Sequence, residues 1–145
     1  MTYPQQALAK AATEALDLVE NSGRPHLFGL VDAAFLSQAM PGIDADPLNL
    51  ILEEFPQEVN MKDSASVRQY VSTVTWPEQV CGAAFGEVIT FDDEEGIRHE
   101  GPMVKLVLRN GQSITLLRME DQSLRGGDNI APEVADMLAY TLTDD

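Results

Sequence analysis

An Asn-Gly pair at positions 110 and 111, between two apolar β-rich runs, constrains the fold of this chain more than any other stretch. Both residues tolerate the positive φ that tight reversals need, so the sequence predicts a β-hairpin over residues 103–118. A loop of Asn110 and Gly111 alone would mix polar residues into the apolar face. A three-residue loop that starts at Arg109, with Gly111 left-handed, avoids this, and we predict that register. One face is then Val104, Leu106, Leu108, Ile114 and Leu116, and the other is Lys105, Val107, Ser113, Thr115 and Leu117.

Apolar residues recur at helical spacing in four further segments. The pattern predicts helices over residues 5–21 and 27–39, from Ser64 to about residue 75, and from Pro132 to residue 142. The apolar stripe of the first helix is narrow and rich in alanine, which favours packing against another helix. The second segment is apolar over more than half of its circumference, so we expect a helix that is largely buried and central.

Two more segments are typical of strands. Residues 48–55 form a short apolar run after a polar loop over residues 42–48, which favours a strand, although the length also suits a helix. Residues 80–91 follow the Trp76-Pro77 corner and are typical of a long strand. The acidic run over residues 92–95 lacks the spacing of a calcium loop and fits a solvated turn, as does Gly126-Gly127. Small residues in the long strand leave room for a helix or another chain to approach closely: Cys81, Gly82, Ala83, Ala84 and Gly86.

These elements predict one α+β domain over residues 1–145. We expect a single layer of mainly antiparallel sheet, with about four strands and a central β-hairpin, covered on its apolar face by about four helices. The strand near Leu50 joins this sheet at a position that the sequence leaves open. If it joins its neighbour in parallel through the Ser64 helix, the crossover should be right-handed.

The charge of the chain narrows the classes of partner. It carries 24 acidic and 9 basic residues, for a net charge of -15 and a pI near 4.2. Such a field repels phosphate backbones and anionic lipids, so we expect neither nucleic acid nor a membrane as a partner. The single cysteine excludes an intramolecular disulfide and fits a reducing compartment. With no apolar signal core at the N-terminus and no membrane-length apolar run, we expect a soluble cytoplasmic protein.

Catalytic and cofactor motifs do not stand out, and we predict no catalytic residue, no metal and no cofactor. His26 and His99 are far apart in sequence, and one cysteine cannot complete a usual zinc site. Cys81 lies among apolar small residues with no neighbouring cation, so we expect an inert thiol. The sequence contains neither a phosphate-binding glycine loop nor a serine-nucleophile elbow.

Two classes of function fit these observations. The first is a non-enzymatic protein-binding or adaptor module, similar to a secretion chaperone in size, charge and element order, whose partner is another protein or a second copy in a homodimer. Because basic residues gather in the hairpin region, we expect the partner-binding surface at Lys105, Arg109 and Arg118. An equal alternative is that the basic residues of this region pair with acidic residues on neighbouring strands, namely Glu87, Glu100 and Glu120.

The second class is a small-molecule pocket, used for binding or for catalysis. It would lie between the helix over residues 27–39 and the strand over residues 80–91, with Asp32, Trp76 and Arg118 as its polar and aromatic edge. Two of these residues also have a structural interpretation. Asp32 would lie at the border of an apolar stripe, and Trp76 would be a packing anchor.

Four segments carry a resemblance to a known group of proteins: HLFGLVDAAFL (26–36), TWPEQVCGAAFGEVI (75–89), KLVLRNGQSITLLR (105–118) and GGDNIAPEVADMLAYTL (126–142). Together they resemble a family of conserved hypothetical proteins from actinobacteria. That family has no assigned activity, so the resemblance implies a bacterial cytoplasmic protein and carries over no catalytic residue. Its members are often longer, with a larger insertion at residues 92–101.

Overall fold

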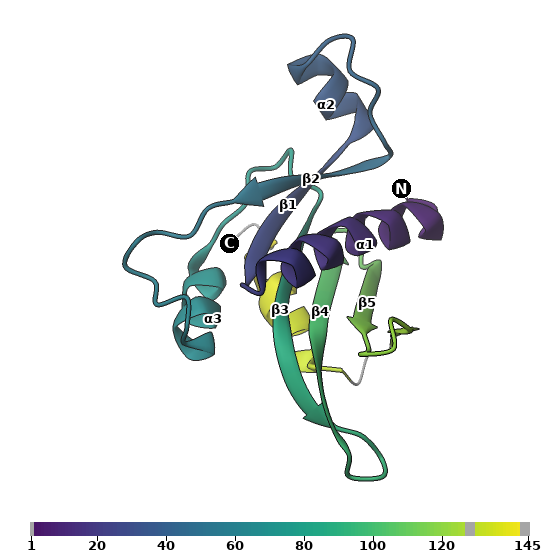
Figure 1. Cartoon of the computed structure of the whole chain (residues 1–145). Coiled ribbons are helices and arrows are strands. Elements are labelled where there is room, and N and C mark those ends of the chain that lie inside the picture. Colours follow the sequence, from purple (N-terminus) through teal and green to yellow (C-terminus); the bar gives the residue numbers. More distant parts are fainter. Residues whose placement is uncertain (1, 127–129, 143–145) are drawn as a thin grey trace.

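The computed structural model describes residues 2–126 and 130–142, which form an α+β arrangement (Figure 1). Its strands form one antiparallel sheet, in the spatial order β2-β1-β3-β4-β5-β6. The α+β class is confirmed, but the sheet formed by the described residues has six strands where about four were predicted. The described elements are α1 (Gln5–Ser22), β1 (His26–Asp32), α2 (Ala33–Ala39), β2 (Leu48–Glu53), α3 (Ser64–Thr73), β3 (Gly82–Asp92), β4 (Arg98–Leu108), β5 (Ser113–Arg118), β6 (Leu124–Arg125) and α4 (Pro132–Thr141).

The β4–β5 hairpin has the register predicted from the Asn-Gly pair. Leu106 pairs with Ile114. The backbone N–H of Leu108 donates to the carbonyl of Gln112 at 2.8 Å, which closes a three-residue loop. Gly111 in this loop has a φ of 95°, a conformation that a residue without a Cβ adopts at no steric cost. The predicted turn at Gly126-Gly127 lies partly outside the described residues.

Residues 27–39 do not form one helix, so this prediction is wrong. The first part is strand β1, which lies between β2 and β3, and helix α2 begins only at Ala33. Leu27 packs towards α3 and α4, whereas Phe28 packs towards α1. A strand that is buried on both faces has a continuous apolar run, and such a run has no period that separates it from a buried helix.

The predicted strand near Leu50 is confirmed as β2, and the structure gives its neighbour. β2 pairs antiparallel with β1, with Leu50 opposite Leu30. The parallel crossover through α3 therefore does not occur in the described sheet. Leu48 and Leu50 contact the core beneath α1, and β2 forms one edge of the sheet.

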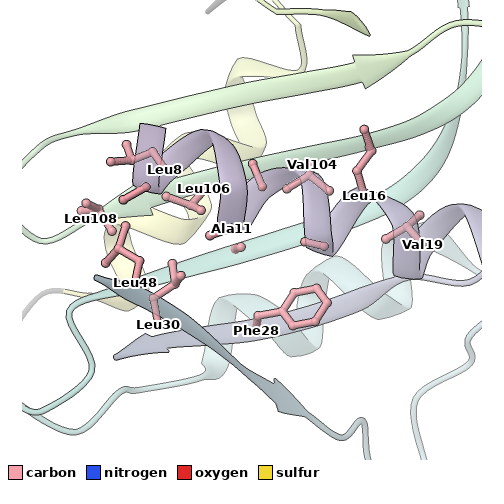
Figure 2. Close-up of a cluster of buried hydrophobic side chains, with 14 residues drawn as sticks. Leu8, Ala11, Leu16, Val19, Phe28, Leu30, Leu48, Val104, Leu106 and Leu108 are labelled. Carbon is pink, nitrogen blue, oxygen red and sulfur yellow. The ribbon is translucent and has the colours of Figure 1, made fainter. Parts of the chain in front are cut away.

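Helices cover both faces of the sheet, where the sequence predicted one covered face. Helix α1 packs across β3, β4 and β5 instead of against another helix (Figure 1). Its Leu8, Leu16 and Val19 belong to one buried cluster with strand residues that include Leu106 (Figure 2). Helices α3 and α4 lie on the opposite face, so the sheet has a core on each side.

A glycine in β3 allows α1 to lie close to the sheet. A Cβ added to Gly86 would stand 2.6 Å from Cγ2 of Val19 and 2.8 Å from Cγ2 of Val104. Ala84, in the same core, is fully buried. The small residues of β3 therefore admit the close approach of a helix, as the sequence predicted, and that helix is α1.

Candidate functional site

A short arm stands away from the body of the molecule at one end of the sheet (Figure 1). We call residues 33–43, which comprise α2 and the turn that follows it, the apolar arm. Asp32 caps α2, because its Oδ1 accepts a hydrogen bond from the backbone N–H of Phe35 at 2.8 Å. None of the seven residues of α2 is buried. Phe35 and Leu36 are half-buried, and Met40 is 53% exposed. Burial within this chain therefore contributes little to the stability of the arm.

The apolar arm contains no charged residue, in a chain whose net charge is -15. Its sequence, AAFLSQAMPGI, is apolar except for Ser37 and Gln38. The base of the arm is held by Asn49, whose amide group donates to the carbonyl of Asp46 at 2.7 Å and accepts from its N–H at 3.1 Å. A side chain at the start of β2 therefore holds the point where the arm returns to the sheet.

Strand β2 forms an open edge of the sheet beside the arm. Within the described residues, β2 pairs with β1 alone, so the polar backbone groups on its outer side have no strand partner. Ile51 and Leu52 in this strand are 43% and 53% exposed. We call Leu48–Glu53 the open edge. The opposite edge is β6, which has only two residues and is therefore a poor template for further pairing.

Exposed apolar side chains concentrate on these two features. The described residues include eight exposed large hydrophobic side chains, and four of them lie between residues 40 and 52: Met40, Ile43, Ile51 and Leu52. The others are spread over the rest of the chain. Acidic residues flank the open edge on both sides, with Asp44 and Asp46 before it and Glu53 and Glu54 at its end. The surface therefore combines an apolar centre with an acidic border.

The residues predicted to line a pocket do not come together. Asp32 is the N-cap of α2. Trp76 packs with the core on the α3 and α4 side, and its Nε1 donates to Oγ1 of Thr141 at 3.1 Å. Arg118 ties β5 to α1, since its Nη1 lies 2.8 Å from Oδ1 of Asp17. These three side chains are engaged in three different parts of the fold.

The predicted partner-binding residues are held within the chain. Lys105 is 2% exposed. Arg109 donates to the carbonyls of Val80, Trp76, Pro77 and Leu142, and so ties the hairpin loop to the 76–80 corner and to the end of α4. The side chain of Arg118 is 12% exposed. Their charges are engaged inside the structure, so the geometry favours a different interaction surface.

The space proposed for a pocket between residues 27–39 and residues 80–91 is filled. Strands β1 and β3 are direct neighbours, with Gly29 opposite Ala83. A Cβ on Gly82 would stand 2.5 Å from the side chain of Leu108. A pocket of about 850 Å³ lies elsewhere, lined by residues that include Phe91, Leu117 and Ile130 and by the acidic residues 92–95.

A histidine between two carboxylates was not predicted from the sequence. His99 Nε2 lies 2.7 Å from Oδ2 of Asp93, and its Nδ1 lies 3.1 Å from Oε1 of Glu120. Hydrogen bonds to Asp93 and then to Glu120 raise the pKa of His99 above its ordinary value. The two ring nitrogens point to different carboxylates, so the three groups do not converge on one point. The closeness of His99 to the acidic turn in sequence was the available signal.

The single cysteine lies beside Tyr3. Burial raises the pKa of the Cys81 thiol, and Sγ donates to the carbonyl of Leu30 at 3.3 Å. Burial, followed by the nearby Cys81, raises the pKa of Tyr3 to about 12. Both groups are therefore protonated at neutral pH, a state that disfavours nucleophilic chemistry.

Residues 2–126 and 130–142 contain neither a membrane-spanning helix nor a metal-binding cluster. Among them, no helix has the length and apolar character needed to cross a membrane, and no cluster of three or more His, Cys, Asp or Glu side chains is arranged to hold a metal ion. In comparisons with known proteins, no family model, no curated protein sequence and no solved structure matches the chain. The resemblance to an actinobacterial family therefore stays an expectation from the sequence.

Proposed function

We propose that this chain is a non-enzymatic protein-binding module that holds an extended segment of a partner protein along the open edge. The observation that carries the proposal is the exposure of Ile51 and Leu52 on an edge strand that pairs with β1 alone among the strands of residues 2–126 and 130–142. Natural proteins usually protect such edges with lysine, proline or a bulge. β2 has the sequence LNLILE, with one charge at its last residue and no proline.

Backbone pairing would supply much of the affinity. A segment that adds to a sheet edge forms main-chain hydrogen bonds, each with a net contribution of about 0.5–1.5 kcal/mol. Ile51 and Leu52 add apolar contact, and because successive side chains point to opposite faces, the two residues lie on different sides of the sheet. The partner would therefore place apolar side chains on both faces, at successive positions.

The acidic border sets the charge of the partner. Asp44 precedes the open edge, and Glu53 and Glu54 lie at its end, whereas Asp46 is already paired with Lys10 at 2.7 Å. An extended segment with lysine or arginine at its ends would meet opposite charges there, and one with acidic ends would be repelled. An acidic α+β module of this size that holds a client in extended form would act in the manner of a secretion chaperone.

Synthetic peptides test the proposal. One peptide has successive apolar β-branched residues with lysine at both ends, and its control has proline in place of the central residue, because proline cannot complete a strand ladder. We expect the first peptide to bind in calorimetry and to slow amide exchange over residues 48–53, and the proline peptide to do neither.

A matched pair of variants locates the surface. Leu52→Lys places a positive charge on the open edge, where it would repel the lysines of the peptide. Leu124→Lys makes the same change on the opposite edge, where Leu124 is 49% exposed. We expect binding to weaken at least tenfold in Leu52→Lys and to persist in Leu124→Lys. Equal binding by both variants, or protection at β6 in place of β2, would rule out the open edge.

A further inference from the structure

We propose that a second copy of this chain docks on the apolar arm, so that two arms pack against each other about a two-fold axis. The inference goes beyond the proposed function, because it depends on residues 33–43 and not on the open edge. Helix α2 has seven residues and none of them is buried. Isolated helices of this length are marginal in water, and most helical stability in proteins comes from packing of an apolar face.

The contacts of α2 within its own chain are few. It contacts β1 and β2 at its base, and its remaining surface stands away from the sheet (Figure 1). Phe35 and Leu36 are only half-buried, and Met40 and Ile43 are 53% and 39% exposed. An exposed group of large apolar side chains marks an interaction site.

The lack of charge on the arm favours a second copy of this chain as the docking partner. A basic partner would find no acidic group on the arm itself, because residues 33–43 contain no charge. A partner surface of the same uncharged, apolar composition fits best, and a second arm has that composition. In a two-fold contact the same patch meets itself, which requires self-complementarity. In a chain with a net charge of -15, the arm offers a contact surface that is itself uncharged, with the acidic Asp32 and Asp44 at its two ends.

The side chains of the arm also suit a helix pair. Alanines at positions 33, 34 and 39 lie beside the larger Phe35, Leu36 and Met40. Small residues next to large ones allow the large side chains of one helix to fill spaces on the other. Depletion of charge together with aromatic residues and methionine is the composition found in the core of protein interfaces.

The size of the arm sets the strength of the dimer. A helix of this length spans about 10 Å, so two arms bury less than the roughly 1,200–2,000 Å² of a standard stable interface. The expected dimer is therefore a reversible one that dissociates on dilution in the micromolar range. Added salt should tighten it, because salt screens the repulsion between two strongly acidic copies over distances beyond roughly 10 Å. An interface held by opposite charges would weaken instead.

Sedimentation equilibrium over a range of protein concentrations tests the inference. Met40→Glu places a charge on the arm, and Ile97→Glu places one on the β3–β4 turn, where Ile97 has the same 53% exposure. We expect the dissociation constant to rise at least tenfold in Met40→Glu and to stay within twofold of wild type in Ile97→Glu. A wild type that stays monomeric at a few hundred micromolar would overturn the inference. So would a dimer that Met40→Glu leaves intact.

A cross-link gives an independent measurement that does not depend on how Met40→Glu folds. In a Cys81→Ala background, Gln38→Cys places a thiol at an exposed position of α2. As a control, Asp121→Cys places a thiol at an exposed position of the β5–β6 turn. We expect mild oxidation to give a disulfide dimer from the arm variant at several times the yield from the control. Equal yields would overturn the inference.

Discussion

The Nε2 atom of His99 lies 2.7 Å from Oδ2 of Asp93, across the turn that joins β3 to β4. The other ring nitrogen faces Glu120, just after β5, and the ring stacks on Phe91 with centroids 5.4 Å apart. One side chain therefore connects the tip of the β3–β4 hairpin to the turn that follows β5. Three titratable groups meet there, so the connection depends on pH.

We predict that His99 stabilises the fold most strongly at mildly acidic pH. Its carboxylate partners raise the pKa of His99, so its contribution is fully present below the ordinary histidine pKa of 6.5 and is lost as pH rises through the higher folded value. The His99 hydrogen bond lowers the pKa of Asp93, whose ordinary value is 3.8. A backbone hydrogen bond, followed by His99, lowers the pKa of Glu120, whose ordinary value is 4.5. Their contributions are lost as pH falls through the lowered values, so the connection is complete between pH 4.5 and 6.5.

The measurement is the difference in unfolding free energy between wild type and His99→Gln across this pH range. We expect the difference to be largest between pH 4.5 and 6.5 and to shrink at alkaline pH. His26 is an internal reference in NMR titrations, because burial lowers its pKa below 6.5. The two imidazoles should therefore titrate on opposite sides of that value, and a stability difference that does not change with pH would contradict the prediction.

Gly86→Ala should destabilise the contact between α1 and the sheet. The added Cβ would stand 2.6 Å from Val19 Cγ2 and 3.1 Å from the carbonyl oxygen of Met103. Overpacking of this kind costs about 1–3 kcal/mol in the free energy of unfolding, which urea denaturation measures. The double variant Gly86→Ala with Val19→Ala removes one of the clashing groups, so it should lose less stability than the two single changes summed. If the two losses of unfolding free energy simply added up, α1 would be able to shift away from the new methyl group without losing stability.

Arg68→Met should cost more stability than removing both members of its ion pair. Arg68 Nη2 lies 2.9 Å from Oε2 of Glu87, a residue that is 6% exposed in β3 and also accepts from Ser64 Oγ at 3.0 Å. Removing the arginine leaves a buried carboxylate without its cation. Because the arginine side chain is 31% exposed, we expect a loss of about 2–3 kcal/mol, below the range for fully buried pairs.

Two further variants check this prediction by urea denaturation. The double variant Arg68→Met with Glu87→Met removes the charge and its partner together, so it should be more stable than Arg68→Met alone. Arg98→Met breaks an exposed pair with Asp92, whose members are 74% and 56% exposed, and should cost under about 1 kcal/mol. A larger effect at Arg98 than at Arg68 would contradict the argument from burial.

The elements that the sequence predicted well have strong local signals. The Asn110-Gly111 turn and the alternation around it give the hairpin register, because a two-residue loop would move polar residues to the apolar face. Helix α1 has a period, a proline at its start and a glycine after its end. These signals involve residues that are close in sequence, so they can be recognised without knowledge of the rest of the fold.

The segment over residues 27–39 was predicted wrongly because its apolar residues carry no period. Leu27 and Phe28 are both buried, but against opposite cores. The second half of the segment has the same apolar composition and is exposed as the arm. Length and composition do not separate a buried strand followed by a projecting helix from one buried helix, since both are continuous apolar runs.

The candidate site was hidden from the sequence for a related reason. Basic residues in the hairpin suggested a surface, but Arg118 points to Asp17 and Glu20 on α1. The partners of Arg118 are about a hundred residues away in sequence, and no local sequence pattern predicts them. The open edge is defined by the order of the described strands, in which β2 pairs with β1 alone, and the arm by the lack of buried residues in α2.

The sequence by itself determined the α+β class, the hairpin register, the strands near residues 50 and 85, and the acidic charge of the surface. Each follows from residue spacing and turn chemistry, which act between residues close in sequence, or from composition, which is a sum over the whole chain. The tertiary structure decided that helices cover both faces of the sheet, that β1 lies between β2 and β3, and that the apolar arm is left exposed. These depend on which segments meet across long separations in the chain. An apolar residue becomes part of the core where another element of the chain covers it. It becomes part of an interaction surface where no such element covers it.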